Sequence, residues 1–192
     1  MNGVFTNSTA IAAGDYNEIA ADEGVYLGTG SHVSTGLGSI EDSDIKRLLW
    51  NMYNRLYQPL LKKDSTDSWS YPTAAWRNWN NTTANRVEFV QGLSEEKVYL
   101  YFGGVVAPTA ATNLFCGIDL DGTAGNDADI KSPSPAVAGA IGISASIFHQ
   151  YVSVGYHFLQ LMEYGNAAGA TFYGDAGFPD FYQSGCLGWI YG

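Results

Sequence analysis

Basic residues are the scarcest feature of this sequence. Of its 192 residues, 9 are Lys or Arg and 19 are Asp or Glu, which gives a formal net charge of −10. Phosphate backbones repel a chain of this charge, and no basic cluster is larger than the pair Lys62 and Lys63. We therefore expect no nucleic acid partner.

Cysteine and histidine are also rare. Neither Cys116 nor Cys186 has a second ligand at zinc spacing, and the three histidines are scattered along the chain, which argues against a zinc site. The first residues lack the basic start of a signal peptide, so we expect assembly in a cytoplasm, with the two cysteines as buried thiols. A disulfide between them is the alternative. No apolar run reaches the length of about 18 residues that a membrane helix needs, so no membrane insertion is expected.

The residues that are abundant favour β structure. Hydrophobic residues make up 46% of the chain and aromatic residues 14%, and there are 23 glycines. This composition is too apolar for a disordered chain and too rich in Gly and Tyr for a helical bundle. The length suits one core with a smaller appendage.

Three segments differ in composition. Residues 1–40 are rich in Gly, Ser, Thr and Ala and cannot form a core, so we expect an N-terminal arm anchored on a larger partner. Residues 41–63 are predicted as a helical stem, and residues 64–192 as a β-sandwich knob.

The stem prediction depends on helical periodicity in residues 40–58. Apolar side chains recur there at i, i+3, i+4 and i+7, and Pro59 ends the run. The resulting stripe packs either on its own β domain or against the stripes of two other copies. The predicted oligomer interface on this stripe comprises Ile45, Leu48, Leu49, Met52 and Leu56.

From residue 64 onward, short β segments alternate with turn residues. We expect strands near 67–77, 85–91, 97–106, 113–119, 136–147, 151–164, 169–173 and 186–191. Eight segments in this length suit a two-sheet sandwich of jelly-roll type.

The segment "GYHFLQLMEYG", residues 155–165, is apolar on both faces when it is read as a strand. The second apolar face needs a neighbouring element or subunit, so His157, Leu159 and Leu161 are added to the predicted interface. His157 and Glu163 share a face but lie about 20 Å apart along a strand, which is too far for an acid/base pair.

Two other segments suggest ligands. The stretch "DLDGTAGNDAD" resembles the start of a calcium loop and makes Asp119 and Asp121 weak metal candidates, but Ile130 occupies the position of the required glutamate. An Asp-Gly turn explains the same residues.

The aromatic residues near 172–185 suit either a receptor surface or a trimer interface. The candidate receptor contacts are Trp76, Trp79, Phe178, Phe181 and Tyr182.

No motif for an enzyme or cofactor stands out. The Gly-rich stretch "GTGSHVSTGLG" lacks the lysine of a P-loop, and the common hydrolase signatures are absent. We therefore expect no enzyme and no cofactor. Carboxylate pairs of glycoside hydrolases meet only in the fold, so a glycan-cleaving enzyme remains a weaker alternative.

Several segments resemble those of tailed-bacteriophage virion proteins. They are "DSTDSWSYPTAAWRNWNNTTANRVEFVQGLSEEKV", "GYHFLQLMEYG", "TFYGD" and the terminal "GCLGWIYG". The resemblance implies a small trimeric tail fibre, tail-tip or head-decoration protein with a β-sandwich knob, bound to other virion proteins through its arm. Some such fibres hold a metal with an H-x-H pair, but only His32 is present here, so no metal is expected.

These observations lead to one expectation of function. The chain is expected to be a structural protein of a phage virion, a homotrimeric short fibre that mediates attachment to host-surface glycan or protein. A capsid decoration or head-fibre protein that stabilises the shell is the alternative.

Overall fold

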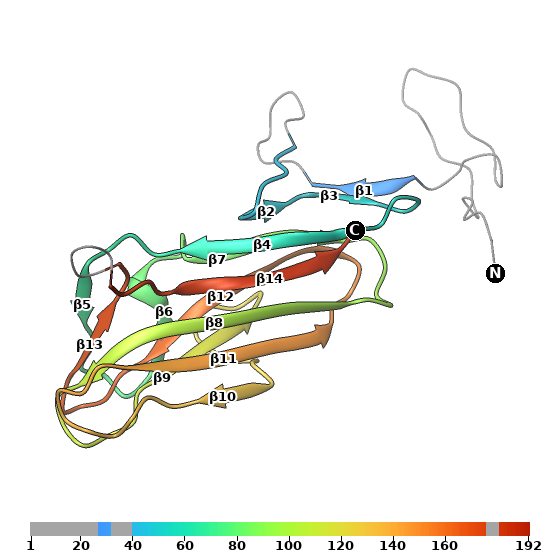
Figure 1. Ribbon diagram of the computed structural model, residues 1–192. Coiled ribbons are helices and arrows are strands. Elements are labelled where there is room, and N and C mark those ends of the chain that lie inside the picture. The colour runs from blue at the N-terminus through green and yellow to red at the C-terminus, as the bar shows by residue number, and fades with distance from the viewer. Residues whose placement is uncertain (1–26, 32–39, 176–180) are drawn as a thin grey trace.

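In the computed structural model, residues 27–31, 40–175 and 181–192 are described, and they are mainly β (Figure 1). The first strands are β1 (Gly28–Gly30), β2 (Lys46–Arg47), β3 (Leu49–Asn51), β4 (Tyr57–Lys63), β5 (Ser68–Ser70) and β6 (Trp76–Asn78). A 3-10 turn, η1 (Trp79–Asn81), precedes β7 (Arg86–Gln91), β8 (Lys97–Pro108), β9 (Phe115–Leu120) and β10 (Ile130–Ser132). The last are β11 (Gly142–Tyr151), β12 (Gly155–Tyr164), β13 (Ala170–Tyr173) and β14 (Gly185–Tyr191).

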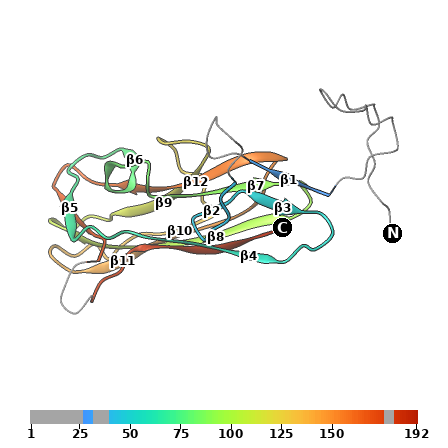
Figure 2. The same cartoon turned by 90° about the horizontal axis from the view of Figure 1, so that it is seen from above.

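Two sheets form the layers of a sandwich (Figure 2). In the seven-stranded sheet, β8 pairs with β11 on one side and, on the other, with β14 along its first half and β13 along its second half. Strands β10, β4 and β5 extend this sheet. In the five-stranded sheet, β12 lies between β9 on one side and β7 with β6 on the other, and β2 pairs with β7.

The core lies between the two sheets. Alternate residues of the long strands face inward, as the period of two in a strand requires. Trp79 is fully buried at the centre of the core, where its ring makes edge contacts with Trp69, Phe102 and Phe172. The prediction of a mainly β chain is confirmed, and each of the eight predicted segments contains a strand.

The predicted helix over residues 40–58 is wrong. This segment forms β2, β3 and the start of β4. Leu48 and Trp50 are buried against Val90, whereas Leu49 between them is exposed, so the apolar residues follow a period of two. The Trp50 indole also donates to the Tyr191 carbonyl oxygen at 2.9 Å. This long-range packing outweighs the local helical pattern.

The two cysteines are free thiols, as expected from the sequence. Cys116 and Cys186 are both buried, and burial raises the pKa of the Cys186 thiol to about 12. In the described part of the chain, no helix is long and apolar enough to span a membrane.

Candidate interaction surface

The outer side of the seven-stranded sheet carries an unusual number of aromatic and aliphatic side chains. We call these outward-facing residues the aromatic face. Its members are Tyr57, Pro59, Leu61 and Lys63 on β4; Gly185, Leu187, Trp189 and Tyr191 on β14; Lys97, Tyr99, Tyr101, Gly103 and Val105 on β8; and Ile143, Ala145, Ile147, His149 and Tyr151 on β11.

Strand register aligns these side chains in rows across the sheet. In one row, Trp189 lies between Pro59 and Tyr99, with His149 on the far side of Tyr99. The rings of Trp189 and Tyr99 are stacked with centroids 4.3 Å apart, and the Tyr57 ring meets Trp189 edge-on at 6.1 Å. Such contacts fix the rings in place and make this part of the face a rigid ridge.

The next row is mainly aliphatic and continues the apolar surface. Leu187 lies between Leu61 on β4 and Tyr101 on β8, and Ile147 follows on β11. Leu187 is 53% exposed in the isolated chain. An apolar surface that spans four neighbouring strands is typical of an interaction site.

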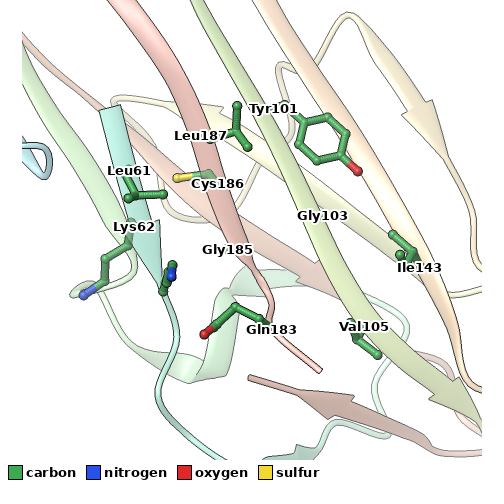
Figure 3. A pocket seen from close by; sticks show the side chains of 11 residues that line it. Leu61, Lys62, Tyr101, Gly103, Val105, Ile143, Gln183, Gly185, Cys186 and Leu187 are labelled. Carbon is green, nitrogen blue, oxygen red and sulfur yellow. The ribbon is translucent and has the colours of Figure 1, made fainter. Parts of the chain in front are cut away.

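A hollow interrupts the face where two glycines lie side by side. Gly103 on β8 and Gly185 on β14 are register partners, and the hollow above them has a volume of about 220 Å³. A Cβ atom at Gly103 would lie 3.1 Å from the Tyr101 hydroxyl, so a larger residue there would crowd the hollow. Figure 3 shows the side chains around it: Leu61, Leu187 and Tyr101 toward one end, and Gln183, Val105 and Ile143 toward the other.

The charge of the aromatic face differs from that of the whole chain. Although the chain carries 19 acidic residues, none of the face residues named above is Asp or Glu. The formal charges of these residues are those of Lys63 and Lys97 at the strand ends, and Lys62 adds a third positive charge beside the hollow. The face is therefore a place where two acidic molecules can meet without opposing carboxylates.

The predicted receptor contacts do not form one surface. Trp76 is partly exposed, but Trp79 is completely buried in the core, so its prediction as a receptor contact is wrong. Phe181 is exposed, and Tyr182 is partly exposed with its ring 5.5 Å from that of Tyr173. Phe178 lies outside the described residues.

Half of the predicted oligomer contacts are core residues. Leu48, His157, Leu159 and Leu161 are buried within the single chain, so their prediction as contacts between copies is wrong. The inner face of β12 is covered by the opposite sheet, and no second subunit is needed to bury it.

The other predicted contacts remain accessible. Ile45, Leu49 and Leu56 are exposed, while Met52 is half-buried beside the small cluster around Trp50. They do not lie on a helix, so the stripe that motivated their choice does not exist.

His157 and Glu163 have separate partners. The His157 Nδ1 lies 2.7 Å from the Asp121 carboxylate, and its Nε2 lies 2.8 Å from the Ser153 carbonyl oxygen. Glu163 is enclosed in the sandwich and accepts hydrogen bonds from Arg77 Nε at 2.6 Å and Trp69 Nε1 at 2.7 Å. Burial raises the pKa of the Glu163 carboxyl. The hydrogen bonds of His157 and Glu163 therefore connect separate parts of the fold to β12.

The two weak metal candidates are used by the turn itself. Asp119 accepts hydrogen bonds from the backbone N–H groups of Ala124 and Gly125. Asp121 bonds His157 and accepts from the backbone N–H of Phe158. Within residues 27–31, 40–175 and 181–192, no three His, Cys, Asp or Glu side chains gather as metal ligands. The turn thus resembles an Asp-Gly connection more than a calcium loop.

Comparison with known proteins gives no family. No protein-family model matches the chain, and no curated protein matches it at a significant level.

Proposed function

We propose that this chain is a structural protein of a phage virion, without catalytic activity, that assembles as a homotrimer through its aromatic face. The observation that carries the proposal is the aromatic face itself, an apolar and carboxylate-free surface on a chain of net charge −10. The segments that resemble phage virion proteins supply the biological setting.

Charge favours a second copy as the partner of this face. Copies of an acidic chain repel one another at most orientations. Contact through the aromatic face keeps the carboxylates of both copies away from the buried area, and it leaves Lys63 and Lys97 at the strand ends. A buried apolar contact with a polar rim is the usual design of a stable interface.

Shape favours a ring of copies. The ridge around Trp189 and the hollow above Gly103 are different surfaces that lie next to each other on one sheet. If the ridge of one copy fills the hollow of the next, the contact is head-to-tail, and such contacts form closed rings when the rotation allows it. The resemblance to virion fibre proteins, which are typically trimeric, favours three copies.

The strand pairing supports a jelly roll as the finer description of the fold. A jelly roll is a long antiparallel ribbon wound so that early strands pair with late ones. Here β4 pairs with β14, β7 with β12 and β8 with β11, which is a nested order. Strand β10 departs from this order because it pairs with β11 at the edge of the seven-stranded sheet. Jelly rolls are common in viral capsid and lectin domains.

Two positions on the particle are compatible with the trimer. In the leading proposal it is a short tail fibre or knob that attaches the phage to the host surface. In the alternative it decorates the capsid and stabilises the shell. Immunogold labelling of whole particles with an antibody to the purified chain distinguishes these positions, and a particle without label contradicts both.

A matched pair of substitutions tests the assembly. Leu187→Asp places an unpaired charge in the proposed interface, which costs several kcal/mol, so we expect monomers with an unchanged circular dichroism spectrum. Val137→Asp is the control, because Val137 lies in the loop between β10 and β11 and is similarly exposed, 58% against 53% for Leu187. It should leave the trimer intact.

Leu49→Asp is the third variant in this experiment. Leu49 is the predicted contact that lies on β3, and it is 51% exposed. If Leu49→Asp dissociates the oligomer while Leu187→Asp leaves its mass unchanged, the interface lies on β3 and the proposed role of the aromatic face is wrong.

A further inference from the structure

A second aromatic hollow lies mainly on the five-stranded sheet, with one lining residue from β10 at the edge of the seven-stranded sheet. Its volume is about 410 Å³. We call it the Trp76 pocket, and it is lined by Trp76, Phe115, Asn126, Lys131 and Tyr164. None of these residues belongs to the aromatic face.

Three rings of the pocket lie in one row across adjacent strands. Tyr164 on β12 is the register partner of Trp76 on β6 and of Phe115 on β9. The ring centroid of Tyr164 lies 5.2 Å from that of Trp76 and 6.2 Å from that of Phe115. All three rings are partly exposed, so the row offers an apolar wall to a ligand.

A glycine lets the polar side of the pocket approach this wall. A Cβ atom on Gly117 would lie 2.8 Å from the Trp76 ring and 2.9 Å from Asn126 Nδ2. Any larger residue at 117 would displace both side chains. Because Gly117 has no side chain, the Asn126 amide and the Trp76 indole can both lie close to the backbone of β9.

Hydrogen bonds fix the orientation of the Asn126 amide. Its Oδ1 accepts from the backbone N–H groups of Ile118 and Ala128, at 3.3 Å and 3.1 Å. The Nδ2 group is enclosed and has no acceptor in the described part of the chain. A buried donor without a partner is uncommon, and a ligand oxygen that enters with a small shift of the surrounding side chains would satisfy it.

The second polar group of the pocket is Lys131. It is exposed on β10 and forms no ion pair with any residue of the described ranges. The pocket thus combines aromatic rings with two donors, and no carboxylate lines it. It suits a ligand that has an apolar face and a strong neutral acceptor.

We propose that the Trp76 pocket binds a pyranose that carries an N-acetyl group. The rings of Trp76 and Tyr164 receive the C–H face of the sugar and the acetyl methyl group. Asn126 Nδ2 and Lys131 Nζ donate to the acetamide carbonyl and a ring hydroxyl. The net charge of −10 disfavours an acidic sugar at the same place.

This proposal gives a ligand to the attachment role proposed above and rests on that role for its biological meaning. Its chemistry depends only on the pocket. Failure of sugar binding by an intact trimer overturns the ligand proposal alone, whereas loss of the trimer with binding retained overturns the assembly proposal alone.

The test is a titration of the full chain followed through the indole N–H signal of Trp76 by NMR. We expect a saturable shift with millimolar N-acetylglucosamine and a clearly weaker response to glucose and to glucuronate. An equal response to glucose, a preference for glucuronate, or no response to any of the three overturns the proposal.

Three variants locate the site, and for them ligand binding is followed from the sugar signals by saturation transfer. Trp76→Ala should lower the affinity about tenfold or more. Asn126→Asp keeps an oxygen for Ile118 and Ala128 but replaces the Nδ2 donor, so it should lower the affinity similarly, and its circular dichroism spectrum checks that the variant is folded. Phe181→Ala is the control, because Phe181 is an exposed aromatic residue outside the pocket. Wild-type affinity in a folded Asn126→Asp protein, or loss of affinity in Phe181→Ala, contradicts the proposal.

Discussion

At the scale of single residues, Glu163 is a charged group held between the two sheets of the sandwich. Its side chain is fully enclosed, and both carboxylate oxygens accept a hydrogen bond, one from Arg77 and one from Trp69. The Arg77 guanidinium also lies 3.7 Å above the Tyr71 ring. Both donors need an acceptor, and only a carboxylate of this shape supplies two.

We predict that Glu163→Gln lowers the free energy of unfolding by about 2 kcal/mol, because the new amide N–H₂ faces a buried donor. Denaturation in urea measures this change. Glu95→Gln is the control: Glu95 is exposed and pairs with Arg55 at 2.8 Å, so its replacement should cost less than about 1 kcal/mol. Equal losses in the two variants would contradict the structural role of Glu163.

The effect of Glu163→Gln should also depend on pH. Burial raises the folded-state pKa of Glu163 above its unfolded value of about 4.3, so the folded chain binds this proton more tightly than the unfolded chain. The resulting stabilisation is complete below the unfolded pKa and is lost as the pH rises through the folded pKa. The difference in stability between wild type and variant should therefore be larger near pH 4 than at pH 7. A pH-independent difference would show that the pKa is not raised.

At the scale of elements, the sequence predicts strands well where turns bound them. Segments such as 85–91 and 97–106 have clear limits, and the strands there begin and end within two residues of these limits. Two strands of the main sheet were missed. The sequence predicts the residues of β4 as the end of the helical stem, and β10 has three exposed residues and little alternation of apolar and polar residues. Pro59 is tolerated inside β4 because β4 is an edge strand paired only with β14.

The predicted helix failed because two periods coexist in residues 45–57. Leu48 and Leu49 both fall on a helical stripe, but only alternation separates the buried Leu48 from the exposed Leu49. Leu48 and Trp50 contact Val90, and Trp50 donates a hydrogen bond to Tyr191. These contacts with distant parts of the chain favour the strand over the helix. Local sequence does not contain this information.

These two neighbouring leucines give a direct test of the strand. Leu48→Ala should destabilise the fold by about 2 to 5 kcal/mol because it empties a buried position. Leu49→Ala, the same change at an exposed position, should alter stability by less than about 0.5 kcal/mol. Thermal or urea unfolding of both variants checks this, and similar losses would favour the helix.

The candidate surfaces depend on register more than on composition. Tyr99, Tyr101 and Trp189 alternate with buried residues in the sequence, which is a signal that each strand has an apolar outer side. Their gathering on one face depends on the pairing of β8 with β14, strands about 90 residues apart. In the same way Trp76 was chosen from sequence, but its neighbours Tyr164 and Asn126 are brought to it only by the fold.

At the scale of the whole molecule, the two layers of the sandwich have different outer surfaces. The seven-stranded sheet presents the aromatic face, and the five-stranded sheet presents the Trp76 pocket. If copies meet through the first, the pocket on the other layer stays open to solvent. Assembly and ligand binding then use different surfaces of one small domain, although Lys131 of β10 brings one side chain of the seven-stranded sheet to the pocket.

The central claim is that copies of this chain cover the aromatic face of one another. Native mass spectrometry of the purified protein tests it most directly. We predict a species of three times the 20.7 kDa chain mass that persists on dilution to low micromolar concentration. A single species at the monomer mass, with Leu187 and Trp189 open to solvent at every concentration, would contradict it.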